Sequence, residues 1–159
     1  MSIVDLSKPN RDTTLLAPFV QNRLLMALNE CHDLGYPVAI FEGYRSPARQ
    51  QYLWEQSRVN KKAKKVTNAQ AWQSMHQYSV AFDLAFLPRP KAWHWPAADD
   101  PIWDKVQEIF ERFGFESLSW ERPHFEITAG MKWQEMKKIH DRDGLLGLWN
   151  VIEMRLKKS

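Results

Sequence analysis

Apolar residues that recur every three or four positions predict four helical stretches. Pro18 suits a first helical turn and Gly35 suits a stop, while Ser46 followed by Pro47 is a usual helix start. Gly144 is expected to break the last stretch, because glycine disfavours a helix interior. The predicted helices run from Pro18 to Gly35, onward from Ser46, from Asp100 to near Gly114, and from Met131 to Lys158. The supporting apolar stripes are Leu24, Leu25, Leu28 and Cys31 in the first helix and Trp103, Val106, Ile109, Phe110 and Phe113 in the third.

Shorter runs of β-branched and aromatic residues predict four strands between these helices. They cover Val38 to Phe41, Val80 to Phe86, Phe115 to Trp120 and His124 to Ile127. Alternation in the second run puts Asp83 on the face of the small Ser79 and Ala81, and the bulky residues on the other face. Helices mixed with short strands indicate an α+β fold, with a small, mainly antiparallel sheet flanked by helices.

The chain is predicted to form a single domain over residues 1–159. Residues 1–14 are expected to be a loosely held polar arm, residues 15–127 the core with the candidate catalytic residues, and residues 128–159 a C-terminal helical tail. Between Ser57 and Gln73 the apolar period is lost, which predicts a long solvated loop. The lysines from Lys61 to Lys65 are expected to lie on its wet surface.

Composition narrows the classes of protein that this chain can be. A hydrophobic content of 44% can supply a core, and the single Cys31, which cannot form an internal disulfide, is expected to fill it. Charged residues near the start interrupt any signal peptide, and no apolar run approaches the roughly 20 residues that span a bilayer. The net charge of +3 is too small to indicate nucleic acid. We therefore expect a monomer without nucleic-acid partners or stable membrane association.

Two clusters along the chain offer metal ligands. His76 precedes Asp83 by seven residues, and Glu121 precedes His124 by three. A catalytic zinc ion keeps three nitrogen or oxygen ligands from the protein and leaves a fourth position open. His76, Asp83 and His124 could supply these ligands, while Glu121 stays free to act as a base. Arg45, at the end of a predicted strand, offers a cation for a substrate carboxylate or carbonyl oxygen.

Each of these residues also has a simpler interpretation. A histidine seven residues before an aspartate is common by chance, and Glu121 alone could be a solvent-facing carboxylate paired with Arg122. Arg45 alone could be a surface guanidinium. Glu126 shares a predicted strand face with His124, so it either orients that side chain or is an ordinary edge carboxylate. The two clusters together favour the metal site. Three further histidines are expected to take no part in it: His32, His94 and His140.

Several segments match the motifs of a known family. Ser74, His76, Ala81 and Asp83 fit the signature S-x-H-x-x-G-x-A-x-D, and Glu121 and His124 fit its later acid-x-x-H element. Tyr44, Arg45, Ser46, Gln50 and Leu53 are similar to its Y-R-S-x-x-x-Q-x-x-L segment. From Phe41 to Ile127 the chain thus resembles the zinc peptidases that include D-alanyl-D-alanine carboxypeptidases, vancomycin-resistance dipeptidases and L-alanyl-D-glutamate endopeptidases of bacteria and phages. Residues Val66 to Ala69 are similar to the lead-in of the last group.

The resemblance implies a role for each matched residue. It implies zinc ligands at His76, Asp83 and His124, a catalytic base at Glu121, and a contact from Arg45 to the substrate or transition state. The candidate substrate contacts are Arg45, Gln50, Ser74 and Trp120. At one position the chain departs from the signature: Ser79 replaces the usual glycine, so a serine must adopt a backbone conformation that glycine adopts freely. The lysine run also replaces a shorter Gly/Pro-containing turn expected in the endopeptidases.

The function implied by the resemblance is zinc-dependent hydrolysis of a peptide bond in the peptidoglycan stem. The lead-in favours an L-alanyl-D-glutamate endopeptidase, for example a phage endolysin. A D,D- or L,D-carboxypeptidase is the nearest alternative, and a non-catalytic wall-binding zinc domain is an alternative of another class. The place of action would be the bacterial cell wall or periplasm. Without a recognisable signal peptide, the chain is expected to be made in the cytoplasm and released by another route.

Overall fold

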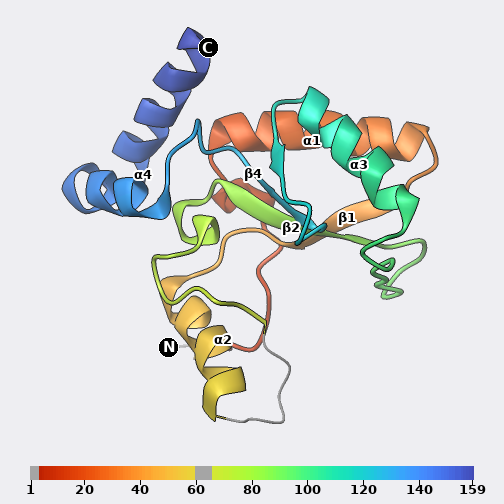
Figure 1. Cartoon of the computed structure of the whole chain (residues 1–159), viewed down its shortest axis with the longest axis horizontal. Helices are drawn as coiled ribbons and strands as arrows, with labels where there is room; N and C mark the ends of the chain where they lie inside the picture. The colour runs from red at the N-terminus through yellow and green to blue at the C-terminus, as the bar shows by residue number, and fades with distance from the viewer. Residues whose placement is uncertain (1–3, 60–65) are drawn as a thin grey trace.

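A four-stranded antiparallel sheet forms the centre of the computed structural model, which describes residues 4–59 and 66–159 (Figure 1). The strands lie in the order β1-β2-β4-β3. The elements are η1 (Thr13–Leu15), α1 (Pro18–Asp33), β1 (Val38–Glu42), α2 (Pro47–Val59), η2 (Met75–Tyr78), β2 (Ala81–Phe86), α3 (Pro101–Arg112), β3 (Glu116–Ser117), β4 (His124–Glu126) and α4 (Trp133–Lys158). The α+β class and the antiparallel sheet expected from the sequence are confirmed.

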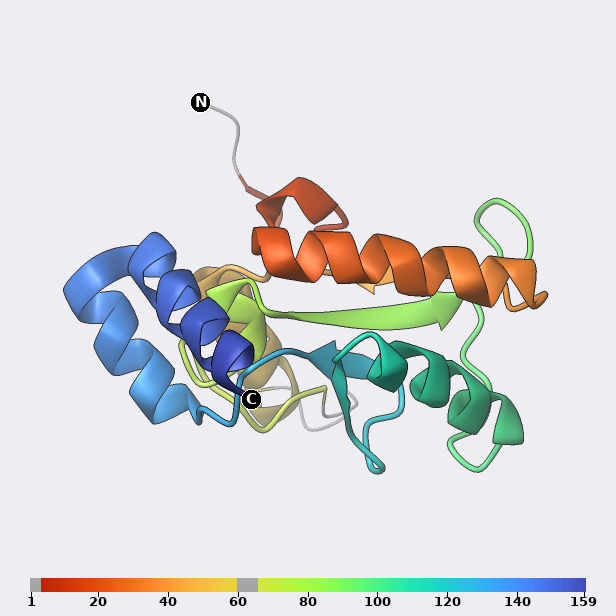
Figure 2. The same ribbon diagram turned by 90° about the horizontal axis from the view of Figure 1, so that it is seen from above.

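The two faces of the sheet have different neighbours. Helices α1 and α3 lie side by side over one face, whereas α2 lies on the opposite side (Figures 1 and 2). The aromatic rings of Phe82 and Phe125 contact Phe110 of α3, and all three side chains are fully buried. Cys31 of α1 is buried in the same core, as expected. The other face is therefore left for the polar residues of β2 and β4.

A β-bulge at Phe41 changes which side chain of β1 reaches that polar face. Ile40 pairs with Leu84 of β2, but the next paired residue is Glu42, opposite Asp83. Opposed residues of neighbouring strands point to the same face of a sheet, and an extra residue shifts the alternation by one position. The bulge therefore places the Glu42 carboxylate beside Asp83 rather than in the apolar core.

The turn between β3 and β4 corrects a prediction. The sequence predicts a strand from Phe115 to Trp120, but β3 covers only Glu116 and Ser117. Gln107, a buried residue of α3, donates hydrogen bonds from Nε2 to the carbonyl oxygens of Leu118 and Arg122, at 3.1 and 3.4 Å. Because a helix side chain satisfies these carbonyls, residues 118–123 form a turn instead of a longer strand.

The N-terminal arm makes several contacts with the rest of the fold. Between residues 4 and 14, the carbonyl oxygen of Leu6 accepts a hydrogen bond from Arg49 Nη1 at 2.7 Å. The carbonyl oxygen of Asn10 accepts one from the Gly43 backbone N–H at 2.8 Å. The guanidinium of Arg11 lies 4.8 Å from the ring centre of Phe41. Each of these contacts joins the arm to residues more than 25 positions away, so the local pattern of the sequence could not indicate it.

Other boundaries differ by a few residues, and the tail has the expected break. Helix α2 continues to Val59, beyond the predicted start of the loop, and the run from Lys61 to Lys65 lies outside the described residues. Gly144 has non-helical torsion angles within α4, as predicted. The second half of α4 packs on the core, where Trp149 Nε1 donates to the carbonyl oxygen of Tyr78 at 2.9 Å. In the parts of the chain that the structure describes, no helix combines the length and the apolar character needed to cross a membrane.

Ser79, which stands where the resembling family has glycine, has a left-handed backbone conformation. Its φ and ψ are 60° and 29°, and its buried hydroxyl group has no hydrogen-bond partner. The left-handed conformation costs an L-residue roughly 1–2 kcal/mol, and glycine recovers this at an entropic cost of roughly 0.5–1 kcal/mol. We expect Ser79→Gly to raise the free energy of unfolding by about 1 kcal/mol, or Tm by about 2–4 °C.

Thermal and urea unfolding of Ser79→Gly and Ser79→Ala separate the backbone effect from the hydroxyl effect. Ser79→Ala removes the unpaired hydroxyl but keeps the Cβ atom and hence the backbone strain. Equal stability of the two variants would show that the backbone of Ser79 is not strained.

Candidate active site

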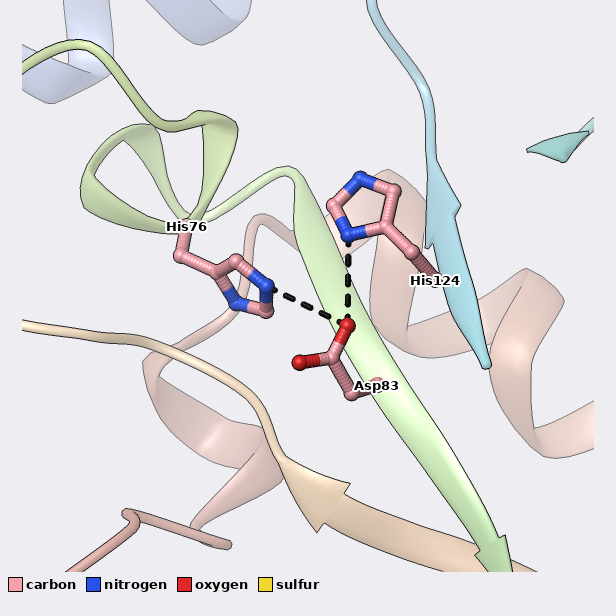
Figure 3. A group of neighbouring side chains, drawn as sticks. All are labelled: His76, Asp83 and His124. Atoms are coloured by element: carbon pink, nitrogen blue, oxygen red, sulfur yellow. Dashed lines mark hydrogen bonds and ion pairs between the residues drawn. The ribbon is translucent and has the colours of Figure 1, made fainter. Parts of the chain in front are cut away.

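The sheet register brings together residues that are far apart in the sequence. Asp83 of β2 lies directly opposite His124 of β4, although 41 positions separate them. His76 lies in the short helix η2, which leads into β2. Figure 3 shows the His76, Asp83 and His124 side chains converging on one point. The three predicted ligands therefore form one cluster, which we call the His-Asp-His cluster.

The distances within the His-Asp-His cluster fit a bound metal ion. His76 Nε2 lies 3.4 Å and His124 Nδ1 lies 3.2 Å from Asp83 Oδ1 (Figure 3). One ligand atom from each residue can be chosen so that all three lie within 4.8 Å of one another. A tetrahedral ion with bonds of about 2.0–2.2 Å separates neighbouring ligand atoms by about 3.3–3.6 Å. Since two imidazole nitrogens and a carboxylate oxygen suit a divalent transition metal, both spacing and chemistry are right.

Each imidazole has a second partner that fixes its orientation. His76 Nδ1 lies 2.8 Å from the carbonyl oxygen of Gly43, which leaves Nε2 facing Asp83. His124 Nε2 lies 2.6 Å from Glu126 Oε1, which leaves Nδ1 facing Asp83. Contacts of this kind orient metal-binding histidines in many proteins. Of the two interpretations of Glu126, the structure therefore favours the one in which it orients His124.

The charges in the His-Asp-His cluster stabilise one another. Burial of Asp83 favours its neutral form, but His76 and His124 outweigh this and hold its pKa well below the usual range. Burial of His124 opposes its charged form, yet hydrogen bonds to Asp83 and Glu126 raise its pKa to about 10. The pocket therefore favours cations, which is the electrostatic requirement for holding a metal ion.

Glu121 and Trp120 lie on the turn between β3 and β4, at the edge of the same cleft. This cleft has a volume of about 550 Å³, and its lining includes the His-Asp-His cluster, Ser74 and Arg45. Glu121 is accessible to solvent, but the crowded surroundings of its carboxyl group raise the pKa; His124 opposes this shift and the Asp83 carboxylate adds to it. A raised carboxyl pKa suits a group that accepts and returns protons near neutral pH.

Arg45 belongs to a buried ionic network that the sequence did not reveal. Its Nη2 atom lies 2.6 Å from Glu42 Oε1 and 3.5 Å from Asp83 Oδ2. Glu42 also accepts from Nε of Arg49 at 2.5 Å, and Glu42, Arg45 and Arg49 are all buried. Burial of Glu42 raises its pKa, but Arg49 and Arg45 reverse this shift and lower it. The Glu42 carboxylate thus fixes the guanidinium of Arg45 beside Asp83.

Two features of the sequence indicate that Glu42 is a buried carboxylate with arginine partners. A charged residue ends an otherwise apolar strand, and arginines follow it by three and seven positions. A buried carboxylate requires such partners. Without the β-bulge, however, the alternation of β1 would place Glu42 on the core face, so the pattern alone did not single it out.

Removing Glu42 should have a large effect on stability, because it would leave two buried guanidinium groups without their shared partner. We expect Glu42→Ala to lower the free energy of unfolding by about 3–5 kcal/mol. Urea unfolding followed by circular dichroism measures the change. Glu153→Ala, at an exposed position of α4, is the control and should change stability by no more than about 0.5 kcal/mol. A Glu42→Ala protein as stable as this control would mean that the network is open to water.

The structure places the predicted substrate contacts in two different situations. Ser74 and Trp120 line the cleft, and Trp120 is 80% exposed. The Ser74 hydroxyl also accepts from the His76 backbone N–H, as the cap of η2. Gln50 is fully buried behind the cleft, where Oε1 accepts from Arg45 Nη1 at 3.0 Å and Nε2 donates to the carbonyl oxygen of Ala69 at 2.7 Å. Any influence of Gln50 on a substrate therefore passes through Arg45 or the segment at Ala69.

The remaining histidines lie elsewhere in the fold. His32 Nε2 lies 2.8 Å from the carbonyl oxygen of Val38 at the far end of β1. The backbone of His94 pairs with that of Phe86, and the ring of His140 lies tilted against that of Trp72 with ring centres 4.6 Å apart. None of the three belongs to the His-Asp-His cluster.

A known family model matches most of the chain. The family model of VanY, the D-alanyl-D-alanine carboxypeptidases, matches residues 13–134. CwlK, the peptidoglycan L-alanyl-D-glutamate endopeptidase of Bacillus subtilis (strain 168), is 35% identical over 104 residues, which represent 58% of this chain and 62% of CwlK. The match thus spans less than two thirds of that relative.

Three solved structures share the fold. The LD-carboxypeptidase LdcB superposes with a TM-score of 0.55 at 21% identity, over 84% of this chain and 67% of LdcB. The L-Ala D-Glu endopeptidase ChiX of Serratia marcescens gives 0.51 at 19%, over 78% of this chain and 89% of ChiX. VanYB in complex with D-alanine-D-alanine gives 0.55 at 18%, over 80% of this chain and 77% of VanYB. From the family match, we conclude that this chain belongs to the VanY family.

Proposed function

We propose that this protein is a zinc-dependent peptidase that hydrolyses the L-alanyl-D-glutamate bond of the peptidoglycan stem. The observation that carries the proposal is the His-Asp-His cluster in one cleft with the carboxylate of Glu121. The similarity to CwlK supports this choice of bond over the other bonds of the stem. The substrate, the wall as the place of action and the identity of the metal all form part of the proposal.

The metal site is assigned to His76, Asp83 and His124. Two imidazoles and one carboxylate are a usual ligand set for catalytic zinc, which supplies a Lewis acid at the scissile carbonyl and activates water when bound. Glu126 and the Gly43 carbonyl keep the two imidazoles turned toward the ion. Glu121 is outside this ligand set, so its carboxylate is available for proton transfer.

Glu121 and Arg45 have separate roles in this proposal. Glu121 takes a proton from the attacking water and passes it to the amine that leaves, for which its raised pKa is suited. Arg45, fixed by Glu42 and Gln50, directs positive charge into the cleft toward a substrate carbonyl or carboxylate. Its contact with Asp83 keeps the Arg45 guanidinium next to the metal site.

The shape of the site favours cleavage within the stem over removal of its last residue. A second depression, about 270 Å³ in volume, shares Arg45, Asp83 and Glu121 with the main cleft. The main cleft is therefore not the only space beside Arg45, Asp83 and Glu121. An endopeptidase needs room on both sides of the bond, whereas a carboxypeptidase needs a wall at the terminal carboxylate.

Digestion of purified muropeptides, followed by mass spectrometry, tests the bond assignment. We expect products that separate L-alanine, still attached to its sugar, from a peptide that begins with D-glutamate. Release of only terminal D-alanine would instead establish a carboxypeptidase. Binding to cell walls without any cleavage by the zinc-loaded protein would establish a wall-binding domain.

A further inference from the structure

The second depression has an aromatic and apolar wall. Besides the groups that it shares with the main cleft, it is lined by the buried ion pair of Glu42 and Arg49 and by four apolar residues, Phe41, Leu53, Trp95 and Pro123. We call these four residues the aromatic subsite. Trp95 is 43% exposed, so its indole is accessible to a ligand in this depression.

Contacts from three parts of the chain fix the aromatic subsite. Phe41 is the bulged residue of β1, and its ring meets that of Trp95 edge to face with centres 4.8 Å apart. Trp93 contacts Phe41 in the same manner at 5.3 Å, and Arg11 of the N-terminal arm packs over both rings. An aromatic surface held in this way loses little conformational entropy when a ligand binds. The firm attachment of the arm thus contributes to a rigid binding surface.

The main cleft differs in chemistry from the aromatic subsite. Its wall beyond the His-Asp-His cluster includes the polar residues Thr67, Asn68, Gln73 and Ser74. Amides and hydroxyls suit the peptide groups and carboxylates of a stem. The main cleft therefore offers more hydrogen-bonding side chains, whereas the second depression offers aromatic and aliphatic side chains beside the buried Glu42–Arg49 pair.

The proposed substrate has the same asymmetry. L-alanine is the first residue of the stem, and its nitrogen is acylated by the lactyl group of N-acetylmuramic acid. On one side of the L-alanyl-D-glutamate bond the sugar is thus only one residue away, and on the other side the stem continues as peptide. A pyranose ring presents a face of C–H groups, which pack well against the electron-rich face of an indole.

We propose that the aromatic subsite binds the N-acetylmuramyl group of the substrate and so selects stems that are still attached to the glycan strand. This inference rests on the proposed cleavage of the L-alanyl-D-glutamate bond. The peptide that begins with D-glutamate then occupies the polar side, under the exposed indole of Trp120. In this arrangement Trp95 is a specificity-determining residue, and Phe41 holds its indole in place.

The test compares two substrates that differ only in the sugar. One is the N-acetylmuramyl stem peptide and the other is the same peptide with an N-acetyl group on L-alanine. We expect the zinc-loaded protein to have the higher kcat/KM for the first. Trp95→Ala should lower kcat/KM for the sugar-bearing substrate roughly three- to tenfold and leave that for the sugar-free substrate nearly unchanged. Trp95→Phe should retain most of the preference, because it keeps an aromatic face.

Trp120→Ala is the matched control, since it removes an indole from the polar side. It should lower kcat/KM for both substrates by a similar factor. Three outcomes would overturn the aromatic subsite while the bond assignment stands. The parent protein could have equal kcat/KM for the two substrates, or Trp95→Ala could lower kcat/KM equally for both. The third is a loss of the preference for the sugar-bearing substrate in Trp120→Ala instead of Trp95→Ala. Products from a different bond, identified by mass, would overturn the proposed function and this inference with it.

Discussion

Glu121→Gln is expected to lower turnover steeply while leaving the metal and the fold in place. Glutamine keeps the size of the side chain and its capacity for hydrogen bonds, but it cannot accept the proton from water. General acid-base catalysis typically contributes about 100- to 10,000-fold, and here one carboxylate serves both proton transfers. We therefore expect kcat to fall by about 1,000- to 10,000-fold on muropeptides.

Two measurements accompany the rate in this experiment. Metal content should match that of the parent protein, because Glu121 lies outside the His-Asp-His cluster. Glu108→Gln, at an exposed position of α3 outside the cleft lining, controls for the loss of a carboxylate and should keep the parent rate. A Glu121→Gln protein without metal would make Glu121 a ligand, and one with the parent rate would assign the base to another group such as Glu126.

Replacing any one of His76, Asp83 and His124 by alanine should remove the metal. The isolated protein is expected to hold about one zinc per chain, bound by three side chains that no single segment provides. Loss of a partner that merely orients a ligand typically weakens affinity about 10- to 100-fold. Loss of the ligand itself should exceed that range, so the variants should emerge from gel filtration with little zinc.

Elemental analysis of each variant measures this effect directly. His94→Ala is the control, because His94 is exposed and lies outside the His-Asp-His cluster. Full zinc in all three alanine variants would show that the ion binds elsewhere. Retention in one variant alone would identify which of the three residues is not a ligand.

The sequence by itself determined the local features of this protein. Proline at the first position of α1 and α3 and the break at Gly144 depend on nearby residues, and the structure reproduces them. The motif also indicated that Ser79 adopts a backbone conformation that glycine adopts freely, and its φ is positive in the structure. The spacing along the chain was enough to identify His76, Asp83, Glu121 and His124, although it does not show that their side chains lie together in the fold.

Tertiary structure decided what surrounds those residues. Whether Glu42 faces the core or the metal site depends on a bulge of one residue. Only when Glu42 faces the metal site can its carboxylate pair with Arg45 and Arg49. The short β3 strand depends on Gln107 from α3, and the attachment of the arm depends on Arg49 and Gly43. Such contacts join groups far apart in the chain. Since a buried charge or carbonyl takes whichever partner folding brings near, the three-dimensional arrangement and not the local pattern selects that partner.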